Sequence, residues 1–354
     1  MRNTAFTRRH ALQGSTALAA VTLFATPSRA APPPAEAITP ALIEAAKKEG
    51  KCSFYTAMDL AFAERLGKTF EGKYGIAVRV ERSGAERIFT RIGQEYSSNI
   101  HNVDVVNTAD QSHGIVWKRN GWLQPYLPED VAKHYDKTYY DPDAVYITTR
   151  VLVSPIGYNT SLVKKEDVPK SFADLLDPKW AGKMVKAHPA YSGTIMNATF
   201  QISRDIGWDY LEKLAKQRIL QVQSATDCPK KIALGERAIA VDCAGYLVIR
   251  DKEAGRTVDV VYPTEGTPLA TSPSALFKAA PNPNAGKLFQ NWMHSREAQQ
   301  VLVDWARQYS PHRQTVEKPG VRPLKDIKLM KEDAVGVERD AQMIKDKYAK
   351  LFKV

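Results

Sequence analysis

Short apolar segments alternate with longer amphipathic segments along most of the chain. The apolar segments Cys52–Tyr55, Ile76–Val80 and Val103–Val106 are each followed by a short polar loop, and then by residues with helical periodicity. A strand–loop–helix unit that occurs three times in succession is typical of a parallel sheet covered by helices. The first part of the chain is therefore predicted to be an α/β lobe.

The stretch Val151–Ser161, VLVSPIGYNTS, is predicted to leave this lobe for a second one. A return segment, Val258–Ser272, leads back to the apolar strand Ala275–Phe277. Two strands that link two α/β lobes indicate a hinge, with a ligand cleft between the lobes. We therefore expect lobe 1 to comprise residues 38–152 and 267–354, including the C-terminal helices, and lobe 2 to comprise residues 153–266.

The second lobe repeats the alternation of strands and helices. Its predicted strands are Lys183–Ala187, Leu220–Val222, Ala238–Val241 and Val258–Val261. Its predicted helices are Ile195–Ser203, Asp209–Lys216, Cys228–Leu234 and Tyr246–Glu253. Outside this lobe, residues 125–142 are expected to be irregular, and Lys331–Leu351 is expected to form a final charged helix.

The N-terminus has the pattern of an export signal. Arg8 and Arg9 precede an apolar run of small residues, Ala17–Ala25, and a cut after Ala30 would have small residues at the required positions. Residues 7–12 are similar to the twin-arginine motif, and an ordinary Sec signal is the alternative. Residues 1–30 are therefore predicted to be a cleaved signal peptide, and the periplasm is the expected compartment.

Charge and cysteine content narrow the ligand class only slightly. The formal net charge is +11, and the four arginines of residues 1–30 leave +7 on the remainder. Because the basic residues are spread along the chain, no nucleic-acid partner is expected, whereas an anionic ligand fits. In an oxidising compartment Cys228 and Cys243 could form a disulfide, and Cys52 is expected to be an inert core thiol.

Catalytic motifs are missing from the sequence. It contains no GxSxG, HExxH, P-loop or GxGxxG pattern, and its seven histidines are scattered. An enzyme is therefore not expected, no cofactor is predicted, and no metal ligands can be assigned.

The loops that precede helices are the best candidates for a ligand site. Tyr191-Ser192-Gly193-Thr194 offers hydroxyl groups and a glycine at a helix start, where free N–H groups bind anions, and Ser83-Gly84 has the same form. The alternative is that these are ordinary N-caps. Arg87 could direct its guanidinium at an anion or be solvated, and Asp242 could hold a cationic group or cap the next helix. The remaining candidates lie at strand–helix junctions on the same edge: Tyr55, Asp59, Asp110 and Tyr246.

Three stretches of the sequence resemble the periplasmic solute-binding proteins of ABC importers, in the iron(III)-type branch also called extracellular solute-binding protein families 1 and 6. These stretches are residues 157–194, GYNTSLVKKEDVPKSFADLLDPKWAGKMVKAHPAYSGT, residues 260–300, VVYPTEGTPLATSPSALFKAAPNPNAGKLFQNWMHSREAQQ, and residues 104–110, DVVNTAD. The resemblance implies a type II-like two-lobed fold that closes on a ligand and passes it to an inner-membrane ABC permease. A monomer is expected.

The resemblance leaves the ligand open. Ferric-binding members of the branch use neighbouring tyrosines where this chain has residues 241–246, and only Tyr246 stands there. The expected ligand is therefore a small anion, either a phosphonate, an organophosphate or a carboxylate. Ferric iron carried as the transported ligand is the alternative. A sensory protein that presents its ligand to a membrane receptor is an alternative of another class.

Overall fold

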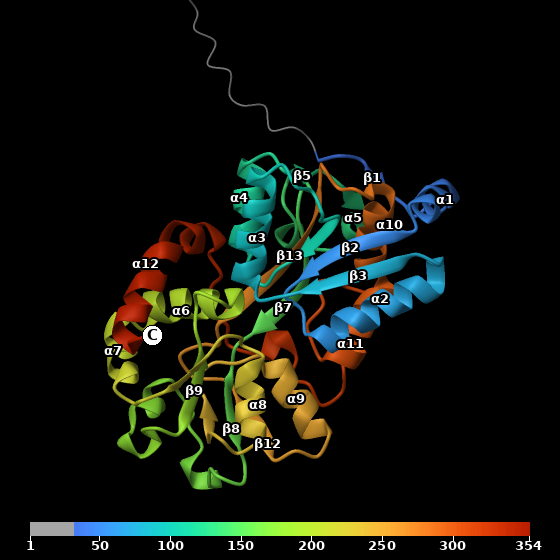
Figure 1. Cartoon of the computed structure of the whole chain (residues 1–354). Coiled ribbons are helices and arrows are strands. Elements are labelled where there is room, and N and C mark those ends of the chain that lie inside the picture. Colours follow the sequence, from blue (N-terminus) through green and yellow to red (C-terminus); the bar gives the residue numbers. More distant parts are fainter. Residues whose placement is uncertain (1–31) are drawn as a thin grey trace, which may run out of the picture. The chain divides into compact units, whose positions relative to one another are not determined.

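The computed structural model describes residues 32–354, so the predicted signal peptide lies outside the described residues. Two β-sheets, one in each lobe, organise this part of the chain (Figure 1). Among the described helices, none is both long enough and apolar enough to cross a membrane.

The sheet of lobe 1 is built from the repeated units that the periodicity predicts. Its spatial order is β3 (Ala77–Arg82), β2 (Lys51–Thr56), β4 (Val105–Asn107), β13 (Leu269–Phe277) and β5 (Leu123–Gln124), and β7 (Ile147–Val153) also pairs with β13. β2 runs parallel to both β3 and β4, whereas β13 is antiparallel to β4, β5 and β7. The carboxyl ends of β2, β3 and β4 therefore meet at one edge, as expected for such a sheet.

Helices cover both faces of this sheet, and buried aromatic residues hold them there. They are α1 (Pro40–Glu49), α2 (Leu60–Tyr74), α3 (Ala85–Ser97), α4 (Gln111–Arg119), α10 (Pro283–Met293) and α11 (Arg296–Ala306). On one face the ring of Phe289 lies 5.0 Å from that of Phe54 and 5.1 Å from that of Phe70. On the other face Ile92 and Trp117 are buried. The predicted packing of residues 285–305 on lobe 1 is therefore confirmed.

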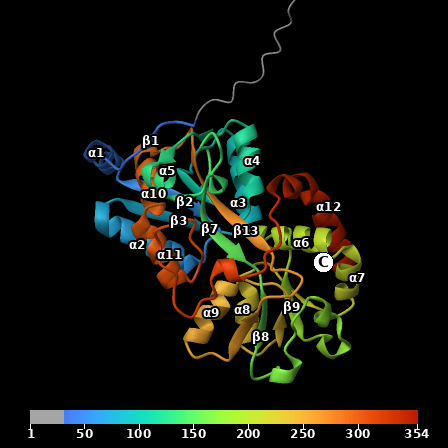
Figure 2. The ribbon, with the colours of Figure 1, turned by 180° about the vertical axis from the view of Figure 1, so that it is seen from behind.

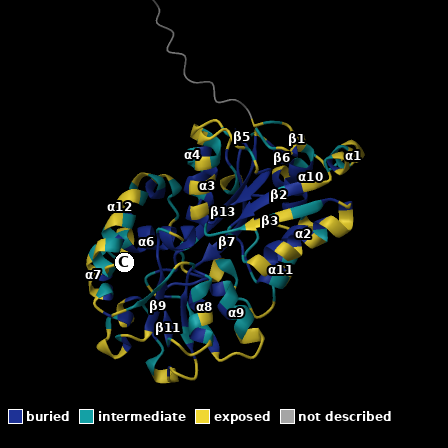
Figure 3. Cartoon of the chain, viewed as in Figure 1, coloured by how far each residue is buried: buried dark blue, intermediate teal, exposed yellow. Residues whose placement is uncertain are grey.

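The sheet of lobe 2 has the order β10 (Leu220–Val222), β9 (Met184–Ala187), β11 (Ile239–Ala240), β8 (Ile156–Asn159) and β12 (Val258–Val261). β9 is parallel to β10 and β11, whereas β8 is antiparallel to β11 and β12. The helices of the lobe are α6 (Gly193–Asp205), α7 (Trp208–Ala215), α8 (Asp227–Ala233) and α9 (Gly245–Glu253). Short 3₁₀ turns lie between β8 and β9, at Lys165–Asp167, Ala173–Leu176 and Pro178–Trp180. The buried positions of both lobes concentrate on the strands and on the helix faces that cover them (Figure 3).

Two strand connections cross between the sheets where the sequence predicts them. β7 continues through Ser154 and Pro155 into β8, and β12 returns through residues 262–268 into β13. β7 and β13 are paired from Leu269 opposite Val153 to Ser274 opposite Ile147. The crossing is therefore a two-stranded ladder, with Ser272 opposite Arg150.

Residues 125–142 are more regular than expected. They contain β6 (Leu127–Pro128), which pairs with β1 (Ala35–Glu36), then α5 (Glu129–His134) and a 3₁₀ turn at Lys137–Tyr139. The expectation of irregular structure rested on the aromatic residues of this stretch and did not take the charge pattern of α5 into account. Its acids lie in the first turn and its basic residues in the last turn, which favours a helix through its dipole.

The last helix, α12 (Ala334–Phe352), contacts both lobes (Figure 2). Its apolar residues Val337 and Ile344 are buried in one cluster with Met196 and Phe200 of α6. On the side of lobe 1, the Lys345 ammonium donates to Glu86 of α3 at 2.6 Å. The segment between α11 and α12 includes a 3₁₀ turn at Leu324–Asp326 and carries Glu332, whose carboxylate accepts from the backbone N–H of Thr271 at 2.6 Å.

Glu332 is expected to make stability depend on pH. Burial raises its pKa from 4.5 to about 7, and the hydrogen bonds from Thr271 only partly oppose the increase. Because the folded protein holds this proton more tightly than the unfolded chain, its contribution to stability is full below about pH 4.5 and is lost as the pH rises towards about 7. Between about pH 5 and about pH 8 the wild type should therefore lose more stability than Glu332→Gln, as measured by thermal unfolding.

Glu317→Gln is the control for this measurement, because Glu317 is exposed in the same segment. It should retain the wild-type pH dependence. Equal pH dependence in the wild type and Glu332→Gln would refute the role of Glu332.

Candidate ligand-binding site

A cavity of about 30 Å³ lies where the two lobes face each other. Lobe 1 lines it with residues at or just after the carboxyl ends of its parallel strands: Ala57, Arg82, Gly84, Ala85 and Ala109. The hinge strand β7 contributes Arg150, Leu152 and Val153. Lobe 2 contributes residues at the starts of its helices: residues 191–194, residues 224–226, Ala244 and Tyr246. The cavity therefore occupies the edge at which an α/β sheet binds its ligands.

Three helices of eight or more residues begin at the cavity wall. The N-cap residues are Gly84 for α3, Ser192 for α6 and Ala244 for α9. Ser192 caps α6 through its hydroxyl, which accepts from the Ile195 N–H at 3.4 Å, whereas α3 and α9 have no side-chain cap. Unsatisfied N–H groups and the helix dipole make such ends favourable places for negative charge.

Arg150 and Arg82 bring positive charge to the same cavity. Arg150 is only 1% exposed; its Nε donates to Ser272 Oγ at 3.0 Å and its Nη1 donates to Gln308 Oε1 at 3.2 Å. Burial lowers the pKa of Arg150 to about 10, although Tyr246 and Asp59 oppose the decrease. Arg82 Nε donates to the carbonyl oxygen of Met58 at 3.1 Å. Among residues 32–354, neither guanidinium has a carboxylate within 4.0 Å.

The structure brings six of the predicted site residues to the cavity: Gly84, Tyr191, Ser192, Gly193, Thr194 and Tyr246. Ser83 precedes Gly84 but does not line the cavity. Arg87 lies at the contact between the lobes instead. Its Nη2 donates to Gln223 Oε1 of lobe 2 at 2.5 Å, and its guanidinium lies 5.4 Å from the Tyr191 ring centroid. Of its two predicted roles, the structure agrees with a solvated side chain, because Arg87 is exposed.

Tyr55 and Asp59 do not line the cavity, because both have other partners. The Tyr55 hydroxyl donates to Glu95 Oε1 at 3.1 Å and accepts from Arg91 at 2.8 Å. Asp59 caps α2 by accepting from the Phe62 N–H at 3.3 Å, and its carboxylate lies 3.8 Å from Arg250 of lobe 2.

Asp242 is also absent from the cavity wall and is fully buried in an ion pair with Lys186 of β9. It does not cap α9, whose N-cap is Ala244 and has no side-chain bond. The sequence correctly suggested a cationic partner, but that partner is a lysine of the protein. Burial raises the pKa of Asp242, and Lys186 opposes the increase.

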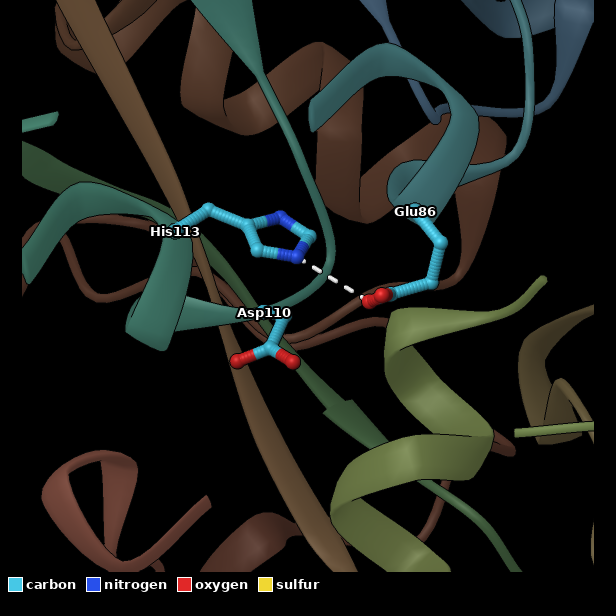
Figure 4. Close-up of side chains that lie close together, drawn as sticks. All are labelled: Glu86, Asp110 and His113. Atoms are coloured by element: carbon cyan, nitrogen blue, oxygen red, sulfur yellow. Dashed lines mark hydrogen bonds and ion pairs between the residues drawn. The ribbon is translucent and has the colours of Figure 1, made fainter. Parts of the chain in front are cut away.

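Asp110 belongs to a buried polar network with Glu86 and His113 (Figure 4). It caps α4 by accepting from the Ser112 N–H at 2.9 Å. His113 Nε2 lies 3.0 Å from Glu86 Oε1, and Lys345 donates to the other Glu86 oxygen. Burial by itself would raise the pKa of Glu86, but His113 and Lys345 together lower it. Burial alone would lower the pKa of His113, and Glu86 raises it above the usual value.

These three side chains have the residue types of a metal site, with ligand atoms within 4.8 Å of one another. A bound cation would, however, displace the His113 contact with Glu86 and compete with the Lys345 ammonium. His113 and the Lys345 ammonium already contact the two oxygens of Glu86, and burial raises the pKa of Asp110. The network is therefore explained as a set of polar contacts that join α3, α4 and α12.

The cysteines are free and fully buried. The disulfide between Cys228 and Cys243, which the sequence left open, is not formed, and both thiols belong to one apolar cluster. Burial raises the pKa of each thiol above its usual value. The expectation that Cys52 is a core thiol is confirmed.

The site residues predicted from the sequence did not include four polar residues of the cavity wall: Arg82, Arg150, Ser224 and Thr226. Arg82 is the last residue of β3 and therefore stands at the carboxyl edge, a position that could have suggested it. Arg150 is the one charged residue of the fully buried strand β7, and a charge inside a buried strand is itself a signal. Ser224 and Thr226 lie just before the start of α8, as the predicted ligand loops lie just before the starts of other helices.

Comparisons with known proteins agree with this architecture. Residues 102–335 match the family described as bacterial extracellular solute-binding protein. An uncharacterized protein of Haemophilus influenzae is 25% identical over 272 residues, which cover 72% of this chain and 76% of the relative.

Two solved structures are similar in fold. The periplasmic binding protein AfuA of Actinobacillus pleuropneumoniae, solved with fructose-6-phosphate, has a TM-score of 0.79 at 23% identity, covering 86% of this chain and 99% of that chain. Iron-bound HitA of Pseudomonas aeruginosa has a TM-score of 0.72 at 21% identity, covering 84% of this chain and 99% of that chain. At these identities the likeness establishes the two-lobed fold alone.

Asp242→Asn should reduce stability and leave ligand affinity unchanged. Removing one charge of a fully buried pair leaves the Lys186 ammonium without its counter-ion, which costs about 3–5 kcal/mol. Chemical denaturation measures the loss, and ligand titration of the folded fraction measures affinity. A variant of normal stability that binds ligand weakly would instead place Asp242 in the site. Asp251→Asn, which removes a partly exposed acid of the same lobe, is the control.

Gly84→Ala should weaken ligand binding by holding the lobes apart. A Cβ at Gly84 would lie 2.5 Å from the carbonyl oxygen of Tyr191 in lobe 2, whereas the Gly84 backbone conformation accommodates alanine. Overpacking of about 1–3 kcal/mol corresponds to a loss of affinity of about 5-fold to about 150-fold.

Gly93→Ala is the matched control, because a Cβ at Gly93 of the same helix meets nothing within 4 Å. Calorimetry gives both affinities, and small-angle scattering with ligand reports closure. Equal affinities for the two variants would mean that the Gly84–Tyr191 contact is not needed for binding.

Proposed function

Because this chain belongs to the family of bacterial extracellular solute-binding proteins, we propose that it captures a small anion between its lobes and passes it to an ABC permease. The observation that supports an anion most strongly is Arg150. A buried guanidinium without a carboxylate partner is unfavourable until an anion reaches it, so the ligand supplies the missing counter-ion. Arg82 and the starts of α3 and α9, which have no side-chain cap, also favour an anionic ligand.

Capture in this proposal is binding without chemistry. Rotation about the β7–β13 ladder would separate the lobes and break the contacts that now join them. Among the polar contacts that would break are Arg87 with Gln223 at 2.5 Å, Arg307 with Glu253 at 2.6 Å, and Asp59 with Arg250 at 3.8 Å. None of these six side chains lines the cavity, so a ligand that contacts both lobes would add to the contacts that favour closure.

Ferric iron is a less suitable ligand for this cavity. One similar structure holds iron, and another holds a sugar phosphate, so the fold accommodates both kinds of ligand. Fe³⁺ prefers several anionic oxygen ligands, whereas among residues 32–354 the wall contains no carboxylate and only Tyr191 and Tyr246 as phenols. Burial raises the pKa of Tyr246, although Arg150 opposes the increase, and two guanidinium groups repel a cation. An anion is therefore the function we favour.

Arg150→Met should abolish tight anion binding without destabilising the unliganded protein. Removal of one partner of a buried charge-assisted contact typically costs 2–5 kcal/mol, or an affinity loss of about 30-fold or more. The melting temperature of the unliganded variant should stay the same or rise, because burial disfavours the charge of Arg150. Calorimetry with methylphosphonate, inorganic phosphate and acetate measures affinity, and differential scanning calorimetry measures stability.

Arg79→Met is the control, because Arg79 is an exposed arginine of β3 outside the cavity. It should bind as the wild type does. The proposal that Arg150 captures an anion is wrong if Arg150→Met binds the ligand as tightly as the wild type does. It is also wrong if only ferric citrate binds to the wild type.

A further inference from the structure

The polar side chains that line the cavity are either cationic or hydroxyl-bearing. Arg82 and Arg150 provide the charge, and the hydroxyl groups come from Tyr191, Ser192, Thr194, Ser224, Thr226 and Tyr246. None of the described residues in the wall is Asp, Glu, Asn, Gln or His. The wall can therefore hold oxyanion oxygens, but it has no carboxylate with which to pair a ligand ammonium.

The nearby carboxylates do not line the cavity and have partners elsewhere, although Asp110 Oδ2 is buried without a hydrogen bond from the described residues. Asp59 caps α2 and lies 3.8 Å from Arg250, and Asp110 caps α4 in the network with His113. An amino group on the ligand would thus enter a positively charged pocket without a counter-ion, which is unfavourable.

The size of the cavity limits the ligand as strongly as its charge does. A single water occupies about 10–15 Å³ on the same measure, so about 30 Å³ accommodates a tetrahedral head group and little more. The walls are set by direct contact between the lobes. A Cβ at Gly193 would lie 2.8 Å from the Cβ of Asp110, and a Cβ at Gly84 would lie 2.5 Å from the Tyr191 oxygen. Apart from the arginines and the hydroxyl-bearing residues, most wall positions are alanines, so the size of the cavity is what excludes a sugar.

From charge and size together, we infer that the ligand is a compact tetrahedral oxyanion without an amino group or a polyol. Inorganic phosphate, sulfate and short alkylphosphonates have this chemistry. The inference rests on the proposed function and narrows it. The two arginines favour the doubly charged form of the ligand.

A matched pair of ligands tests the exclusion of amines. Ethylphosphonate and 2-aminoethylphosphonate have the same carbon chain and differ by the ammonium group. Calorimetry on protein that has been unfolded, dialysed and refolded should give at least about tenfold tighter binding of ethylphosphonate. Inorganic phosphate should exceed fructose 6-phosphate by at least about a hundredfold, because the sugar does not fit while the lobes touch.

The pH dependence distinguishes phosphorus from sulfur oxyanions. Sulfate stays doubly charged between about pH 6 and about pH 8, whereas phosphate and phosphonates gain their second charge near this range. If phosphate or methylphosphonate binds more tightly as the pH rises, and more tightly than sulfate, the ligand is a phosphorus oxyanion. Tighter binding of sulfate without pH dependence assigns a sulfur oxyanion.

Thr226→Asp tests the same inference from the side of the protein. Thr226 lines the cavity at the start of α8, and an aspartate there supplies the carboxylate that the wall lacks. This variant should reverse the preference within the matched pair towards 2-aminoethylphosphonate. Thr226→Asn has the same shape without the charge and should retain the wild-type preference.

The outcomes separate this inference from the proposed function. If 2-aminoethylphosphonate or fructose 6-phosphate binds the wild type as tightly as its smaller counterpart, the inference is overturned while anion capture stands. If no anion in the panel binds and ferric citrate does, both are overturned.

Discussion

The antiparallel pairing of β7 with β13 is the constraint on which the rest of the structure depends. The two strands belong to the sheet of lobe 1 and lead into the two connections to lobe 2, and their pairing also places Arg150 beside the cavity, because Ser272 on the opposite strand accepts a hydrogen bond from its Nε. Gln308 accepts a hydrogen bond from Nη1 of the same guanidinium. In the proposed function, the charge that attracts the ligand therefore lies on one of the two strands that lead to the hinge.

The sequence predicted the fold well because each element carries its own local signal. The three strand–loop–helix units, the crossing at Ser154–Pro155 and the return through residues 262–268 all lie where periodicity and turn residues indicate. The predictions were wrong where an element has no clear local signal. The short helix Glu129–His134 was hidden by surrounding aromatic residues, and the pairing of the first short strand with Leu127–Pro128 depends on residues about 90 positions apart.

The site was less predictable, because a local pattern does not report the partner of a side chain. Helix starts identified Gly84 and residues 191–194 as parts of the cavity wall. The same reasoning selected Asp242, whose partner Lys186 is 56 residues away, and Asp110, whose network includes Lys345 from the last helix. Arg150 was not predicted, because in the sequence it is simply one residue of a strand. Only the structure shows that, among the described residues, no carboxylate lies near it.

Contact between the lobes and selectivity have a common origin in small residues. Gly84 and Gly193 allow the backbones of the two lobes to approach until a Cβ would not fit, and alanines from both lobes form much of the remaining wall. Larger side chains at these positions would keep the lobes apart and leave more room between them, which would admit larger solutes. Close approach also excludes water, so the attraction between an oxyanion and two guanidinium groups acts at a lower dielectric constant than in solvent. In the proposed function, the same small residues would therefore both limit the size of the ligand and strengthen its binding.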